Sequence, residues 1–116
     1  MIGPIELDSI RFGIEKLKAS LVMVLGHEDC AAVKDALYTK KTDPVLPNIF
    51  PLIEPALKNC HEKEGDPVMN AVWCNVLHGV SELKKSLSKN TTVQIVGGYY
   101  DFDQGTVEII RSTSTP

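Results

Sequence analysis

The fold of this chain is decided by residues 21–30, LVMVLGHEDC, where five apolar residues are closed by a glycine. An apolar run of this length is typical of a buried strand in a parallel sheet. Residues 30–38 continue as a predicted helix, with Val33 and Leu37 four positions apart on one face. His27 and Cys30 are therefore expected on the turn between the strand and the helix, which is where open α/β sheets place their ligands.

His27 and Cys30 are candidate zinc ligands. An imidazole and a thiolate bind zinc at roughly 2.0 and 2.3 Å, and a helix amino terminus favours the thiolate form. The alternative is a structural pair, with Cys30 packing as a small apolar residue and His27 bonded to the backbone. Two ligands do not complete a zinc site. A third would come from a second chain or from one of five further side chains: Glu28, Asp29, Cys60, His61 and Cys74.

Four of these five candidates also have simpler interpretations. Cys60 lies on an apolar helical stripe and is expected to pack in the core, and Cys74 beside Trp73 is expected at a packing contact or interface. Asp29 favours the helix amino terminus electrostatically. His61, in a charged loop, is expected to be solvated.

Composition excludes several classes of function. The chain has 116 residues, of which 43% are hydrophobic and 23% charged, so we expect one domain over residues 1–116. The net charge is −3 and the basic residues are scattered, so nucleic acid is not an expected partner. No apolar run approaches the ~20 residues of a membrane span, and no secretion signal opens the chain. Three cysteines, an odd count, argue against a disulfide framework, so we expect a cytoplasmic protein.

The remaining elements follow from periodicity and turn signals. Asp66-Pro67 is a strong helix start, an N-cap followed by proline, and Asp103-Gln104-Gly105 is typical of a hairpin turn. Tyr99 and Tyr100 alternate across a strand, so one should face the core. The expected class is α/β, a small, mostly parallel sheet flanked by helices with a C-terminal β-hairpin. The expected helices cover residues 5–18, 30–38, 50–60 and 66–88, and the expected strands cover 21–25, 93–100 and 106–110.

Several motifs together resemble the β-class carbonic anhydrases. Residues 26–33, GHEDCAAV, resemble the family signature G-H-x-x-C-G-[AG]-[VI], with Ala31 in the place of a glycine. Residues 8–15 resemble the helix before that motif, and 65–76 the long helix after it. Residues 96–101, VGGYYD, and 105–108, GTVE, resemble the closing hairpin.

The resemblance implies a zinc enzyme that reversibly hydrates carbon dioxide to bicarbonate, built as a homodimer. It also implies that His27 and Cys30 share the zinc with a cysteine from an earlier C-x-D-x-R strand, whose Asp–Arg pair tunes the site. The chain lacks that segment, and residues 6–11, ELDSIR, do not replace it because they hold no cysteine. We therefore expect a truncated homologue with weak or absent activity and no assignable catalytic residue. The alternative is a non-catalytic binding or scaffold protein. We also expect the strands over 21–25 and 93–97 to pair directly.

Overall fold

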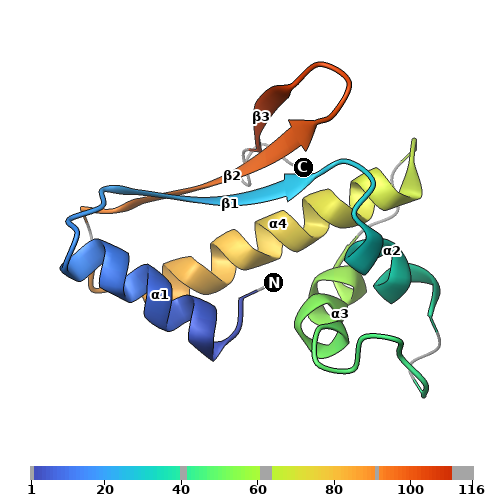
Figure 1. Ribbon diagram of the computed structural model, residues 1–116, viewed down its shortest axis with the longest axis horizontal. Coiled ribbons are helices and arrows are strands. Elements are labelled where there is room, and N and C mark those ends of the chain that lie inside the picture. Colours follow the sequence, from blue (N-terminus) through green and yellow to red (C-terminus); the bar gives the residue numbers. More distant parts are fainter. Residues whose placement is uncertain (1, 40–41, 61–63, 91, 111–116) are drawn as a thin grey trace.

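The computed structural model describes residues 2–39, 42–60, 64–90 and 92–110. The described elements follow the predicted order of a helix, a strand, three helices and a hairpin, and the α/β class is confirmed (Figure 1). The elements are α1 (Pro4–Glu15), β1 (Leu21–His27), α2 (Ala31–Tyr38), α3 (Phe50–Lys58), α4 (Pro67–Ser86), β2 (Gln94–Asp101) and β3 (Thr106–Ile110).

The sheet is mixed and has the strand order β1-β2-β3. β1 pairs in parallel with β2, in a register that runs from Leu21 opposite Gln94 to His27 opposite Tyr100. β2 and β3 form the expected antiparallel hairpin, with Gly98 opposite Ile109. The expected direct pairing of the first two strands is therefore confirmed. β1 is an edge strand among the described residues, and its outer edge faces no other strand.

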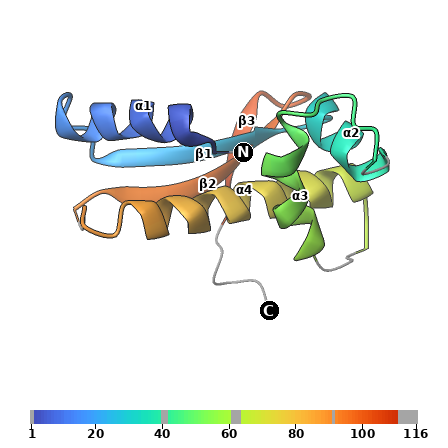
Figure 2. The same cartoon turned by 90° about the horizontal axis from the view of Figure 1, so that it is seen from below.

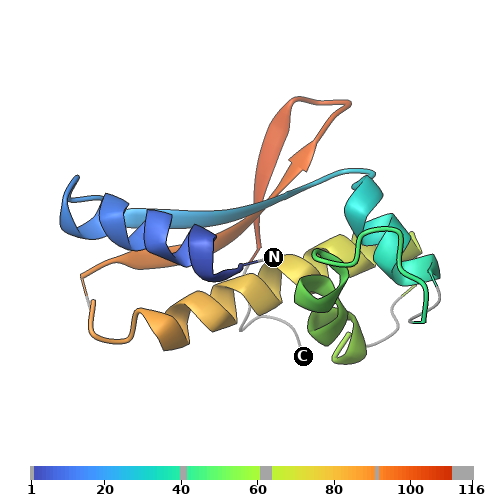
Figure 3. The same ribbon diagram turned by 60° about the horizontal axis from the view of Figure 1, so that its bottom comes forward.

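The described helices lie on one side of the sheet (Figure 1; Figure 3). Asp66 caps α4, its Oδ1 accepting a hydrogen bond from the Val68 amide at 3.0 Å, as the Asp-Pro start predicts. α4 then runs beneath β1 and β2. The main core lies between α4, α2, α3 and the sheet, and a second cluster joins α1 to the C-terminal half of α4 through Ile14, Leu83 and Leu87. Figure 2 shows α1 and α4 extending alongside the strands.

Two glycines allow α4 to approach the sheet closely. A Cβ at Gly26 would lie 2.6 Å from Val76 Cγ2 and 2.7 Å from Val72 Cγ1, and a Cβ at Gly97 would lie 2.8 Å from Val76 Cγ1. No side chain fits at either position without displacing the helix. This contact sets the distance between the end of β1 and α4, and it therefore also positions the turn that follows β1.

The prediction that the first strand is buried is wrong for one of its faces. Val22, Val24 and Gly26 turn toward the helices, whereas Leu21, Met23 and Leu25 alternate with them and are exposed. The apolar run suggested cover on both faces, but the described helices cover only one. The first helix is also shorter than expected and ends at Glu15, before exposed Leu17, and Lys18 has a left-handed backbone with φ of 60°.

A disulfide joins Cys60 to Cys74, which corrects the sequence interpretation of both residues. Cys60 follows α3 and Cys74 lies in α4, so the bond fastens one helix to the other. The odd cysteine count is explained by Cys30, which is free. The paired cysteines have a sequence separation of 14, and sequence periodicity does not reveal that the end of α3 meets α4 at this level.

Candidate functional site

The end of β1 positions both candidate ligands. His27 is the last residue of the strand rather than part of the turn, and Cys30 is the N-cap of α2. Asp29, between them, has a left-handed backbone with φ of 54°, a conformation that Asp tolerates better than most residues. This sharp reversal brings the chain from the strand into the helix within three residues of His27.

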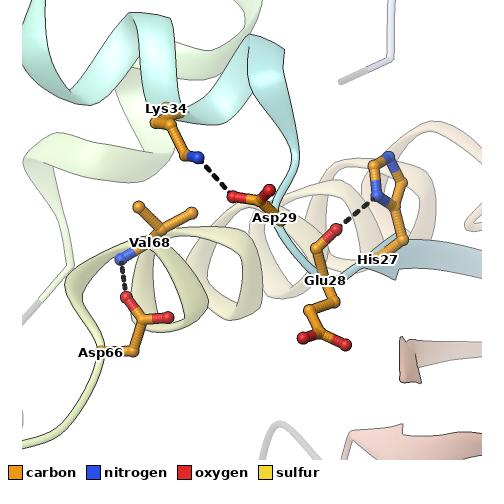
Figure 4. A network of polar contacts seen from close by, with 6 residues as sticks. All are labelled: His27, Glu28, Asp29, Lys34, Asp66 and Val68. Carbon is orange, nitrogen blue, oxygen red and sulfur yellow. Dashed lines mark hydrogen bonds and ion pairs between the residues drawn. The ribbon is translucent and has the colours of Figure 1, made fainter. Parts of the chain in front are cut away.

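His27 is oriented by two contacts. Its Nδ1 lies 2.9 Å from the carbonyl oxygen of Glu28 (Figure 4). When Nδ1 donates that hydrogen bond, Nε2 carries the lone pair that a metal ion would need. The ring also stacks on Phe102, with centroids 5.5 Å apart. The side chain is therefore held at the surface with one nitrogen available.

The turn after β1 is fastened to the β2–β3 hairpin. The Glu28 amide donates to the Tyr100 carbonyl at 3.0 Å, and Glu28 Oε1 accepts from the Phe102 amide at 2.9 Å. Phe102 in turn contacts Tyr100 edge-on at 5.8 Å. Tyr99 points the other way and is buried against Trp73, so one of the two tyrosines faces the core, as expected. Burial raises the pKa of the Tyr99 hydroxyl, and the charge of Glu28 adds to this effect.

Asp29 is engaged away from His27. It forms an exposed ion pair with Lys34 one turn into α2, and Figure 4 shows its carboxylate turned toward that lysine. The hydrogen bond that Lys34 donates to Asp29, together with the negative charge of this carboxylate, raises the pKa of Lys34. Asp29 thus stabilises the first turn of α2 rather than joining the candidate ligands.

His27 and Cys30 line the same groove, which follows the outer edge of β1. The groove has a volume of about 550 Å³ and is bounded by α1, β1, α2 and α4. Asn75 of α4 contributes to its wall, and the buried Oδ1 of this residue has no hydrogen-bond partner among the residues that the structure describes. The sequence gives no signal for this groove beyond the helical position of Asn75. The structure therefore brings the two predicted ligands to one surface and adds an unpaired acceptor nearby.

The described residues do not supply a complete zinc site. Cys60 and Cys74 are in a disulfide, Asp29 pairs with Lys34, and His61 lies outside the described residues. Within the part of the chain that the structure describes, one set of three donor residues could share a metal ion: Glu28, Asp101 and Asp103. This set contains neither His27 nor Cys30.

Two of the three carboxylates of that acidic set, those of Glu28 and Asp101, have structural partners. Asp101 Oδ1 accepts from the amides of Asp103 and Gln104 at 2.8 and 3.1 Å, and so shapes the hairpin turn. Glu28 holds the Phe102 amide. Turn stabilisation accounts for these contacts, so we assign no metal to the cluster.

The features now described define a class: an α/β protein whose edge strand presents a His and a Cys at the entrance to a following helix. The sequence matches the carbonic anhydrase family over residues 5–107, and the chain belongs to that family. A search of curated proteins found no match.

Solved β-carbonic anhydrases share the fold. The chain is similar to the β-carbonic anhydrase CcaA, with 20% identity and a TM-score of 0.75 over 97% of its length. It is also similar to CafA of the fungal pathogen Aspergillus fumigatus, with 24% identity and a TM-score of 0.71 over 100% of its length. A tetrameric β-carbonic anhydrase of Sordaria macrospora gives 17% identity and 0.73 over 95%. The chain spans 61%, 61% and 63% of those three proteins respectively.

Proposed function

We propose that this chain is a β-carbonic anhydrase-like protein whose own residues bind zinc weakly through His27 and Cys30. By itself it should hydrate carbon dioxide to bicarbonate weakly or not at all. The observation that carries this proposal is the groove beside β1, which collects these two donors, while no third His, Cys, Asp or Glu among the described residues lies close enough to share a metal ion with both.

The number of ligands decides between strong and weak metal binding. Catalytic zinc sites retain three protein ligands, and complete structural sites bind zinc with about 10–16 kcal/mol. A site with two protein ligands lacks a large part of that free energy. We therefore expect zinc to exchange readily and to be lost during purification.

Metal analysis and stopped-flow hydration assays test the proposal. We expect purified protein to hold far less than one zinc per chain, and kcat/KM with excess zinc to fall below the ~10⁴ M⁻¹s⁻¹ of ordinary enzymes. His27→Ala and Cys30→Ser should remove the residual zinc without unfolding the chain. His78→Ala, a histidine of α4 outside the groove lining, is the matched control and should not change zinc binding. One zinc per chain together with a rate in the ordinary range would overturn the proposal.

The second candidate function is a non-catalytic binding or scaffold protein with the carbonic anhydrase fold. The incomplete donor set favours it as well. Protein without zinc that keeps full thermal stability would support this function. Zinc-dependent stabilisation that is lost in His27→Ala would instead support the metal-binding function.

A second chain remains a possible source of the third ligand, because the outer edge of β1 faces no strand among the described residues. We propose that the protein forms a homodimer, and the Sordaria macrospora relative is described as tetrameric. A ligand supplied by a partner chain would make the zinc content rise with protein concentration. Zinc content that is independent of concentration would argue against such a shared site.

We also propose a cytoplasmic location. No described helix is long and apolar enough to cross a membrane. The Cys60–Cys74 disulfide is unusual for a reducing compartment, so thiol trapping in cells is the appropriate test. Reduced cysteines would support the cytoplasm, and a fully oxidised pair would contradict it.

A further inference from the structure

The disulfide between Cys60 and Cys74 is accessible to a small reagent in the folded chain. Both cysteines are only partly buried. A surface hollow of about 190 Å³ lies beside Cys74 and is lined by Met69, Asn70, Trp73, Cys74 and Leu77. At ~30 Å³ for each water molecule, this space corresponds to about six waters. A small thiol can therefore reach the bond without unfolding of the chain.

The helix that this bond fastens, α3, is poorly suited to stand alone. It has nine residues, and Pro55 in its interior removes one of its backbone hydrogen bonds. Helices shorter than about 12–15 residues are marginal in water without tertiary contacts. The main contacts of α3 are with α4 and α2, where Phe50 and Ile53 enter the core. The order of α3 therefore depends on this packing and on the covalent link at its end.

A change in α3 would reach one of the two candidate ligands. α2 has eight residues and packs against both α3 and α4, close to the N-terminal end of α4 (Figure 1). Cys30 is the N-cap of α2 and packs against the same core cluster as Phe50 and Ile53. His27, in contrast, ends β1 and stacks on Phe102 of the hairpin. Loosening of α3 would therefore shift Cys30 and leave His27 in place.

We propose that the Cys60–Cys74 disulfide is a redox switch that controls the order of α3 and, through α2, the position of Cys30. This inference rests on the cytoplasmic location proposed above. Disulfides of cytosolic proteins are usually transient, and they serve catalysis or redox sensing rather than permanent stabilisation. A bond that is accessible and that fastens a marginal helix fits such a transient role.

The switch opens by thiol–disulfide exchange with a low-molecular-weight thiol. One thiolate attacks Sγ of Cys74, forms a mixed disulfide and releases Cys60, which takes up a proton. A second thiolate attacks the reagent sulfur of this mixed disulfide, so that Cys74 is released and an oxidised thiol dimer leaves. Two electrons and two protons pass from two thiols to the protein, and closure is the reverse. Cys60 Sγ lies 3.7 Å from the Asn70 carbonyl oxygen, so the reduced thiol has an acceptor in place.

NMR relaxation of the full chain in glutathione buffers tests the switch. In the oxidised chain we expect backbone order parameters of about 0.85 throughout α3, and on reduction values below about 0.6. The Cys30 amide signal should shift on reduction, while the His27 signal should not. Leu83, which packs with α1 in a separate cluster, is the internal reference and should stay ordered in both states. Loss of the Leu83 signal on reduction would show global unfolding and would overturn the switch.

Cysteine variants assign the response to this bond. Cys60→Ser/Cys74→Ser should resemble the reduced wild type and should not respond to glutathione, whereas Cys30→Ala, the matched control, keeps the bond and the response of α3. Reduction of the wild type that requires urea, or reduction that leaves the order of α3 unchanged, would overturn the proposal. A pair that stays oxidised in cells under all conditions would contradict the cytoplasmic location and the switch together, but would leave the zinc proposal intact.

Discussion

The Cys60–Cys74 disulfide should supply a large part of the stability of the helical layer. The bond closes a loop that runs from the end of α3 to the second turn of α4, with a sequence separation of 14. Closing a loop of about 15 residues in the unfolded chain removes close to 10 cal/mol/K of entropy, or about 3 kcal/mol at 25 °C. Domains of this size are stable by about 5–15 kcal/mol. Loss of the bond should therefore remove roughly a fifth to three fifths of the total.

Urea unfolding followed by circular dichroism measures this contribution. We expect the double variant Cys60→Ala/Cys74→Ala, and the reduced wild-type chain, to lose about 3 kcal/mol. Reductant should have no effect on the double variant. Cys30→Ala is the matched control because it removes the free cysteine and keeps the bond. Thiol titration should find one reactive cysteine before reduction and three after it.

The reasoning fails if the chain is confirmed by thiol titration to be reduced and yet loses less than about 1 kcal/mol. Such a result would mean that the contacts of α3 with α4 persist in the unfolded ensemble and already restrict the loop.

Three further predictions concern the fold around the site. Gly26→Ala should lower the free energy of unfolding by about 1–3 kcal/mol, because the new methyl group overlaps two valines of α4 whose side chains are stiff. An unchanged urea midpoint would show instead that the helix can move away from the methyl group without cost. Asp66→Ala should cost about 0.5–2 kcal/mol through loss of the N-cap, whereas Asp66→Asn, which keeps an acceptor, should cost less; equal losses would contradict the cap. Burial raises the pKa of Tyr99 above its unfolded value of about 10, so the neutral form stabilises the fold below pH ~10, and this contribution is lost as the pH rises through the folded pKa. Urea unfolding at alkaline pH should therefore show a steeper loss for wild type than for Tyr99→Phe, and parallel curves would refute this.

Local signals in the sequence were sufficient for most of the fold. The Asp66-Pro67 start, the turn at residues 103–105 and the alternation of Tyr99 and Tyr100 each depend on neighbouring residues, and the structure confirms them. The candidate pair follows the same rule, because only three residues separate the end of β1 at His27 from the start of α2 at Ala31, which leaves little freedom for Cys30. Whether that pair binds zinc stays a prediction.

The features that sequence reasoning missed depend on contacts between distant segments. The disulfide requires the end of α3 to meet Cys74, and no periodicity encodes that meeting. In the sequence, Asn75 does not differ from other polar residues of a helix. Only the structure shows that it lines the groove together with residues of β1 and α1, and that its side-chain oxygen is buried. The exposure of Leu25 could not be foreseen either, because an apolar run indicates that a face needs cover and does not say where the cover comes from.

β1 carries both an exposed apolar face and His27, a candidate ligand of the incomplete zinc site. The alternation of side chains along the strand decides which residues the helices cover. Residues that turn toward α4, ending with Gly26, are satisfied by the helix, whereas those on the other face, ending with His27, are not. The same alternation that exposes Met23 and Leu25 therefore places His27 on the exposed face of β1, where it also lines the groove. Cys30 lies beyond the turn and is held by α2 instead. A change on the exposed face of β1 would therefore act on one candidate ligand, His27, and not on the other.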